Sequence, residues 1–210
     1  MTGRIWRMTA FDLKPNQTWP FSSAGHCVVF VPVGRAKIEG PDRATEIAAG
    51  EAVFLAGGDV VTSTEGAWIF ELSADLVVAK HHSLVPVLSR RAQLPDGDLI
   101  IRADRIDQPA GLTTPSHHHR GPGIRRLVTG RLLAEVGDHI DLITTGQAWF
   151  ESGLEPVVGT NLQRGTNTFV RVMVLPSELA GGKSSFVPTT PFDAARPRGV
   201  TPHVFGECPL

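Results

Sequence analysis

The sequence contains no tyrosine and only two cysteines among its 210 residues. Without a phenol, any acid–base chemistry has to use histidine, glutamate, aspartate, lysine or cysteine. Cys27 and Cys208 are too few and too far apart in the chain for a disulfide framework. Their number favours a reducing compartment and a structural role for each thiol, with one long-range disulfide between them as the alternative.

The sequence also lacks a charge excess and a long apolar run. Twenty basic and twenty-one acidic residues give a formal net charge of -1, and no block of five like charges occurs, so neither nucleic acid nor an anionic membrane is expected as a partner. No segment approaches the roughly 18 apolar residues of a membrane span, and the residues from Met1 onward include no apolar stretch of signal-peptide length. We therefore expect a cytoplasmic protein.

An internal repeat is the strongest architectural signal. Val33-Gly34-Arg35 corresponds to Thr129-Gly130-Arg131, and the segment 50–57 (GEAVFLAG) corresponds to 146–153 (GQAWFESG). The two pairs of glycine turns have the same offset of 96 positions, from 34 to 130 and from 50 to 146. Equal spacing of two independent turns predicts two copies of one module.

Each copy has the pattern of an all-β fold. Short apolar runs bounded by glycine or proline predict strands, and no long helical stretch interrupts them. These runs cover residues 28–33, 52–55, 68–72, 126–128, 140–143 and 169–175. Many short strands at regular spacing predict antiparallel sandwiches or barrels. Residues 76–94 are expected to form a connector between the modules, and the Pro-rich residues 177–210 an extended strap.

Three consecutive histidines, His117 to His119, precede a glycine-rich corner. Residues at i and i+2 of an extended segment share one face, so His117 and His119 can bind one metal ion while His118 points away. The alternative is a solvated surface cluster. The turn at Gly130 follows the triplet, and the equivalent stretch of the first copy has no histidines, which favours the metal site.

These motifs resemble the two short motifs of the cupin superfamily, and the repeat resembles a two-domain bicupin. The resemblance covers most of residues 20–176 and implies two tandem antiparallel jelly-roll barrels. Residues 1–75 would form a degenerate barrel, and residues 95–176 a barrel with a metal site. In that family two histidines and a glutamate from the first motif, with a histidine from the second, usually hold a divalent metal.

The resemblance carries over to this chain only in part. His117 and His119 match the first two ligands, but Gly123 stands at the glutamate position, and the later histidine position falls near Glu155 or Pro156. In the first copy the corresponding positions hold Phe21, Ser23 and Cys27, which form no oxygen and nitrogen ligand set. The first copy is therefore expected to be a scaffold.

If residue 123 faces the barrel interior, Arg125 and Leu127 share that face, while Ile124 and Arg126 face outward. A guanidinium inside a barrel needs an acceptor. Glu151, on the same face as Trp149, is the strongest internal candidate, and it has two competing assignments. It either completes a two-histidine, one-carboxylate metal site or neutralises Arg125 or Arg171 in a structural ion pair.

The leading functional hypothesis is a cupin-type metalloenzyme acting on a small anionic substrate. His117 and His119 would bind Fe, Ni, Mn or Zn, Glu151 would be a ligand or general base, and Arg125 would anchor the anion. Iron would favour dioxygenase-like chemistry, and the other metals isomerase-, lyase- or cyclase-like chemistry. Further substrate-binding candidates, from the pocket-facing strand positions, are Trp149, Leu127, Arg171 and Phe169.

Two other hypotheses stay open. The first is a non-catalytic bicupin that binds a small carboxylate through Arg125, and the second is a storage or scaffold protein whose barrel is only a core. Barrels of this kind expose sheet edges, so a homodimer is a further expectation.

Overall fold

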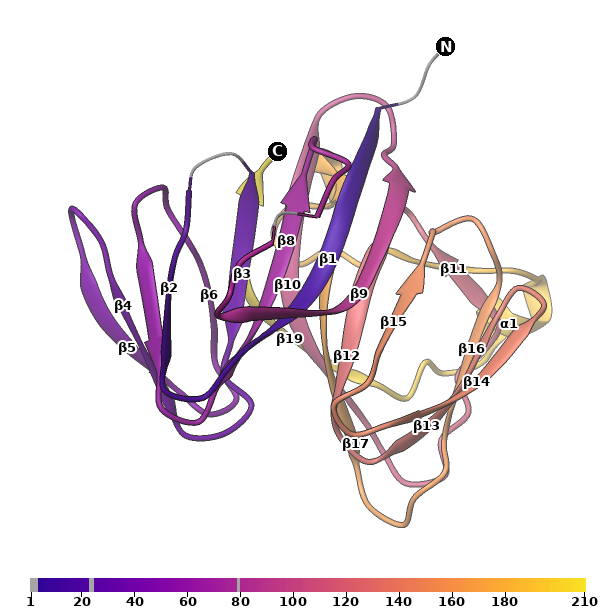
Figure 1. Ribbon diagram of the computed structural model, residues 1–210. Coiled ribbons are helices and arrows are strands. Elements are labelled where there is room, and N and C mark those ends of the chain that lie inside the picture. Colours follow the sequence, from indigo (N-terminus) through magenta and orange to yellow (C-terminus); the bar gives the residue numbers. More distant parts are fainter. Residues whose placement is uncertain (1–3, 23–24, 79) are drawn as a thin grey trace. The chain divides into compact units, whose positions relative to one another are not determined.

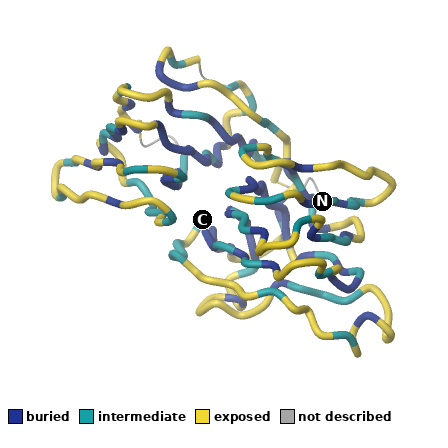
Figure 2. Tube along the Cα trace, turned by 90° about the horizontal axis from the view of Figure 1, so that it is seen from below, coloured by how far each residue is buried: buried dark blue, intermediate teal, exposed yellow. Residues whose placement is uncertain are grey.

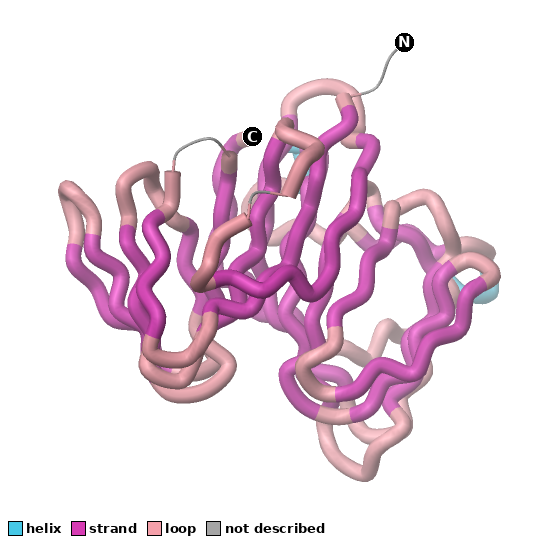
Figure 3. The backbone as a smooth tube through the Cα atoms, viewed as in Figure 1, coloured by secondary structure: helices cyan, strands magenta, loops and turns pink. Residues whose placement is uncertain are grey.

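The computed structural model describes residues 4–22, 25–78 and 80–210, so Ser23 lies outside the described residues. Strands dominate this part of the chain (Figure 3). Its helices are a 3-10 turn at Ser177–Leu179 and the five-residue helix α1 at Pro191–Ala195. Neither of these described helices has the length and apolar character needed to cross a membrane.

Two compact units divide the chain, Ile5–Ala92 and Gln93–Leu210, the second of which also includes Arg4. In the first unit a five-stranded sheet has the order β6-β3-β8-β1-β9, and a four-stranded sheet has the order β2-β7-β4-β5 (Figure 1). The strands are β1 (Ile5–Leu13), β2 (Gln17–Pro20), β3 (His26–Phe30), β4 (Arg35–Glu39), β5 (Ala44–Ala48), β6 (Ala52–Phe54), β7 (Val60–Ser63), β8 (Ala67–Ser73) and β9 (Leu84–Gln93).

The second unit has two five-stranded sheets, with the orders β15-β12-β17-β10-β19 and β14-β13-β16-β11-β18. Its strands are β10 (Leu99–Gln108), β11 (His117–His119), β12 (Gly123–Thr129), β13 (Arg131–Val136), β14 (His139–Thr144), β15 (Ala148–Glu151), β16 (Val157–Asn161), β17 (Asn167–Pro176), β18 (Phe186–Pro188) and β19 (Thr201–Pro209). The strand pairings described within all four sheets are antiparallel.

The repeat is confirmed at the level of single hydrogen bonds. The amide of Gly50 donates to the carbonyl of Val31, and the amide of Gly146 donates to the carbonyl of Leu127, each at 2.8 Å. Donors and acceptors are both displaced by 96 positions, from 50 to 146 and from 31 to 127. The φ angles of the two glycines are +85° and +87°, in the left-handed region that other residues rarely adopt.

The interior of the first unit is apolar. Side chains from both of its sheets, among them Val29, Ile38, Val61 and Ile69, form one buried cluster that also contains Phe21 and Cys27. Burial is concentrated in the central strands β1, β3 and β8, whereas the edge strands β5 and β9 are largely exposed (Figure 2). A continuous apolar core therefore lies between the two sheets of the first unit.

Two segments differ from the expected connector and strap. Residues 76–94 include β9, which lies at the edge of a sheet beside β1, and residues 177–210 include β18 and β19. β19 covers the edge of β10, with which it pairs from Thr201 to Pro209. Because β19 is itself an edge strand, its prolines remove no hydrogen bond that a central strand would need.

A cavity lined by histidine, arginine and carboxylate

A cavity of about 180 Å³ lies inside the second unit. Alternate residues of β10, β12, β15 and β17 point into it from one sheet, and β11, β13 and β16 line it from the other. The first sheet supplies the buried charges, and the second supplies the imidazoles and aliphatic side chains. The charged side chains from the first sheet are Arg102, Asp104, Arg125, Glu151 and Arg171.

Strand β11 places the histidines as the i and i+2 spacing predicts. His117 and His119 are buried and line the cavity, whereas the half-buried His118 faces a separate surface pocket. β11 is held in this register by β18, where His117 pairs with Pro188 and His119 with Phe186.

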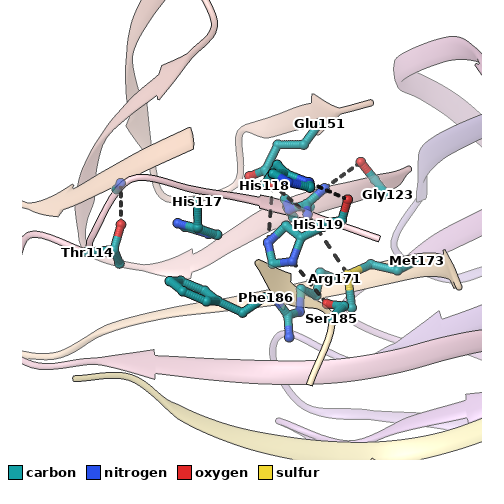
Figure 4. Close-up of polar contacts among 12 residues, drawn as sticks. Thr114, His117, His118, His119, Gly123, Glu151, Arg171, Met173, Ser185 and Phe186 are labelled. Carbon is teal, nitrogen blue, oxygen red and sulfur yellow. Dashed lines mark hydrogen bonds and ion pairs between the residues drawn. The ribbon is translucent and has the colours of Figure 1, made fainter. Parts of the chain in front are cut away.

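Each imidazole is oriented through its Nδ1 atom. Nδ1 of His117 donates to the carbonyl of Pro115 at 2.9 Å, which leaves Nε2 as an unprotonated acceptor. Nδ1 of His119 lies 3.0 Å from the hydroxyl of Ser185, which can accept its proton in the same way (Figure 4). The two rings meet edge to face with centroids 5.0 Å apart, and His117 stacks on Phe186 at 4.2 Å.

Both histidines are held in the neutral form. Burial lowers the pKa of His117, and burial together with the positive charges of Arg125 and Arg171 lowers the pKa of His119 further below its usual range. Neutral imidazole with a free Nε2 is the form that ligates metal ions.

Glu151 is the carboxylate nearest to these rings. Its Oε2 lies 2.6 Å from Nη2 of Arg125 and 3.5 Å from Nε2 of His119, and its Oε1 accepts a hydrogen bond from the indole of Trp149 at 2.9 Å. The approach of Arg125 is not aligned as a hydrogen bond, so Oε2 is a buried oxygen held by charge attraction but without a donor. Glu151 thus lies beside Arg125 and beside one histidine of the pair, His119.

Gly123 explains how the guanidinium of Arg125 fits. A Cβ atom at residue 123 would lie 2.6 Å from Cγ of Met173 and 3.0 Å from Nη1 of Arg125. Nη1 donates instead to the carbonyl of Gly123 at 2.7 Å, and the side chain of Arg125 is 1% exposed. Burial lowers the pKa of Arg125 to about 10, so it remains a cation at neutral pH.

Arg171 has a partner of its own. It lies opposite Asp104 in the β10–β17 ladder, and its Nε and Nη2 atoms donate to the two oxygens of that carboxylate at 2.6 and 3.0 Å. Arg171 therefore does not share Glu151 with Arg125. A bidentate pair of this kind is fully compensated.

The cavity contains side chains of the types that bind divalent metal ions. Nε2 of His117, Nε2 of His119 and the donorless Oε2 of Glu151 are the nitrogen and oxygen ligands of a two-histidine, one-carboxylate site. Across the described residues, however, no group of three or more histidine, cysteine, aspartate or glutamate side chains is already gathered as a metal cluster. Glu151 is shared with Arg125, so the preformed part of the site is the histidine pair.

Of the other predicted substrate-binding residues, some line the cavity and one does not. Trp149 and Phe169 line the cavity and contact each other with ring centroids 5.2 Å apart. Leu127 packs in the apolar cluster beneath them and does not line the cavity. The carboxylate of the exposed Glu155 is bonded to Ser152.

Ile124 and Arg126, which the strand parity places on the outer face, are both buried. Their exposed fractions are 1% and 4%. Their outward-facing positions on the strand therefore do not expose them to solvent.

Several cavity residues were missed by the sequence reasoning. Asp104 lies on the cavity side of β10, but this strand also contains Arg102, Arg105 and Asp107, so its sequence did not single out Asp104. Ser185, Phe186 and Arg198 come from the expected strap, where no periodic pattern marked them.

No protein-family model matches the sequence, and no curated protein matches it. Solved structures do match. AerE from Microcystis aeruginosa superposes with a TM-score of 0.58 at 13% identity, over 83% of this chain and 90% of that one. A cupin 2 conserved barrel domain protein from Leptotrichia buccalis gives 0.52 at 11%, over 83% and 85%. Bacillus subtilis oxalate decarboxylase, described with Mn(II) centers, gives 0.58 at 11%, over 93% and 74%. The chain has the cupin fold, arranged as a bicupin.

Proposed function

We propose that the second barrel is the site of a metal-dependent enzyme acting on a small anionic substrate, with a divalent ion held by His117, His119 and Glu151. The observation that carries this proposal is the pairing of Gly123 with Glu151 in the β12–β15 ladder. Directly opposite residues of neighbouring strands are about 5 Å apart. The carboxylate that the cupin resemblance expects at residue 123 is thus supplied from the adjacent strand.

The protein's own residues would prepare this site for metal binding. The carbonyl of Pro115 and the hydroxyl of Ser185 orient the two imidazoles, and burial keeps both rings neutral. The indole of Trp149 fixes one oxygen of Glu151 and leaves Oε2 directed toward His119. Together these contacts restrict the three ligands before an ion arrives.

The remaining lining would exclude water and orient an anion. Trp149 and Phe169 provide apolar surface, which strengthens the electrostatic interactions of a bound substrate. Arg125 forms an ion pair with the carboxylate of Glu151 and places positive charge near the reacting group. A bound divalent ion would supply Lewis-acid polarisation of a carbonyl, or oxygen chemistry if it were iron.

The structural comparisons support a metal in this fold without identifying it. The Bacillus subtilis oxalate decarboxylase is described with Mn(II) centers. Its identity to this chain is 11%, so its substrate does not transfer. Manganese is nevertheless among the ions to test first, together with iron, nickel and zinc.

Metal content measured by plasma mass spectrometry on untagged protein tests the proposal. The His117→Ala/His119→Ala variant should lose a near-stoichiometric ion. A His81→Ala/His82→Ala variant is the matched control, because these histidines also adjoin each other but lie outside the cavity. Protein that holds no ion and fails to take up Fe, Ni, Mn or Zn would rule the metalloenzyme out.

A second candidate is a non-catalytic bicupin that binds a small carboxylate. The observation that favours it is the existing ion pair between Arg125 and Glu151, at 2.6 Å, which engages the carboxylate that a metal would need. Ligand binding by metal-free protein, with no turnover after loading with any of the four ions, would support this second candidate.

A further inference from the structure

The arginines that line the cavity differ in whether a carboxylate compensates them. Arg125 pairs with Glu151 and Arg171 with Asp104, each at 2.6 Å. Arg102 likewise has its own partner, Glu207, at 2.6 Å. None of these three guanidinium groups is a free cation for a ligand.

Arg198 is the exception within the described part of the chain. Among the described residues no carboxylate forms an ion pair with it, and its Nη1 donates to the neutral hydroxyl of Ser184. Its side chain is exposed and its guanidinium lies 4.5 Å from the ring centroid of Phe186, which in turn stacks on His117 at 4.2 Å. Arg198 is therefore a cation without a carboxylate partner that lines the cavity on its exposed side, with Phe186 between it and the imidazole of His117.

The interior beyond this cation is mostly apolar. Aliphatic and aromatic side chains line it from both sheets, including Ile106, Leu132, Ala134, Val157, Phe169 and Val200. A volume of about 180 Å³ is below the usual size of pockets for drug-sized ligands. In protein without a bound metal ion, a second carboxylate on a ligand would have to enter this lining without a free cation to receive it, which is unfavourable.

We propose that Arg198 binds the carboxylate of the substrate and that the substrate is a small monocarboxylate with an apolar body. The planar guanidinium can bind a carboxylate with two parallel hydrogen bonds, as a lysine could not. The apolar body then extends past Phe186 toward His117. This inference rests on the proposed function, because both place the substrate in the same cavity.

The test is isothermal titration calorimetry of the full chain, treated with a chelator to remove any metal, with three aromatic probes: benzoate, its uncharged amide benzamide, and the dicarboxylate terephthalate. Benzoate should bind at one site, and benzamide and terephthalate at least tenfold more weakly. Arg198→Gln should weaken benzoate at least tenfold and Arg198→Lys by less. Arg164→Gln is the control, because Arg164 is an exposed arginine of the same unit that does not line the cavity, and it should change the affinity less than twofold.

The inference is overturned if benzoate shows no saturable binding at millimolar concentration, if terephthalate binds as tightly, or if Arg198→Gln behaves like Arg164→Gln. These results are separate from metal content. Protein without metal that binds benzoate through Arg198 would contradict the proposed metalloenzyme and keep the substrate assignment. Protein that contains metal, but whose benzoate affinity is unchanged by Arg198→Gln, would support the proposed metalloenzyme and contradict the substrate assignment.

Discussion

Gly123 and Glu151 are direct cross-strand partners, and a side chain at residue 123 would collide with Met173 and crowd the guanidinium of Arg125. The cupin resemblance implies a glutamate at residue 123 on β12. Here the glutamate, Glu151, is on the neighbouring strand β15, and β12 carries the cation Arg125 instead. Both groups are buried, so each depends on the other for its charge to be tolerated.

Glu151→Gln should destabilise the protein by about 3–5 kcal/mol, because it leaves the guanidinium of Arg125 buried without an opposite charge. Urea unfolding of metal-free protein measures the loss. The double variant Arg125→Met/Glu151→Gln should recover part of it, since the unpaired charge is removed. Glu178→Gln, which breaks the exposed pair with Arg120, should cost less than about 1 kcal/mol. Equal losses in Glu151→Gln and Glu178→Gln would contradict the buried ion pair.

The stability of metal-free protein should fall as the pH drops below about 6.5, the ordinary pKa of histidine. Because the folded-state pKa values of His117 and His119 are lowered, the unfolded chain binds more protons than the folded protein as the pH falls. The stabilising contribution is present above the unfolded pKa and is lost toward lower pH, by about 1.4 kcal/mol for each unit of pKa shift.

Melting temperatures between pH 8 and pH 5 test this dependence. His117→Gln/His119→Gln should flatten the curve. His26 will leave a residual slope, because burial also lowers its pKa. A double variant with the full slope of the wild type would show that these rings are protonated in the fold.

Ser185→Ala should weaken metal binding by about 10–100-fold, the usual cost of removing the hydrogen-bond partner that orients a ligating histidine. Competition with a fluorescent chelator measures the affinity for manganese and zinc. Ser116→Ala is the control, because Ser116 adjoins His117 but the hydrogen bonds described for it, with Thr189 and Asp193, use its backbone. An affinity equal to that of the control would mean that Ser185 does not orient the ring.

The thiols should react slowly with Ellman's reagent in the native protein at pH 8. Burial raises the pKa of Cys27 well above its usual range, and half-burial raises that of Cys208. Both are free cysteines, so two thiols should be titrated after unfolding without reductant. Fast native labelling of Cys27 would contradict its place in the core.

The fold was predictable because its signals are local and repeated. The turns at Gly50 and Gly146 need left-handed backbone, and glycine supplies it at both positions. Strand alternation likewise placed His117, His119 and Arg125 on the cavity side of their strands. These inferences need only the period of a strand and the geometry of a turn.

The rest of the site depends on pairing between distant segments, which no local pattern encodes. Ser185 reaches His119 only because β18 pairs with β11. The assignment of Asp104 to Arg171 follows from the register of β10 and β17, and without that register Glu151 had two arginines to choose from. Pro-rich sequence in residues 177–210 concealed two edge strands.

The late position of β18 and β19 in the chain has a consequence for biosynthesis. β11 and β10, the strands they cover, precede them by about seventy and one hundred residues, as the pairs His117–Pro188 and Ile100–Pro209 show. A ribosome would therefore release an open barrel with two uncovered sheet edges before the cavity could close. His119 would gain its fixed orientation only after Ser185 had left the exit tunnel, whereas His117 is oriented by Pro115, which precedes it in the chain.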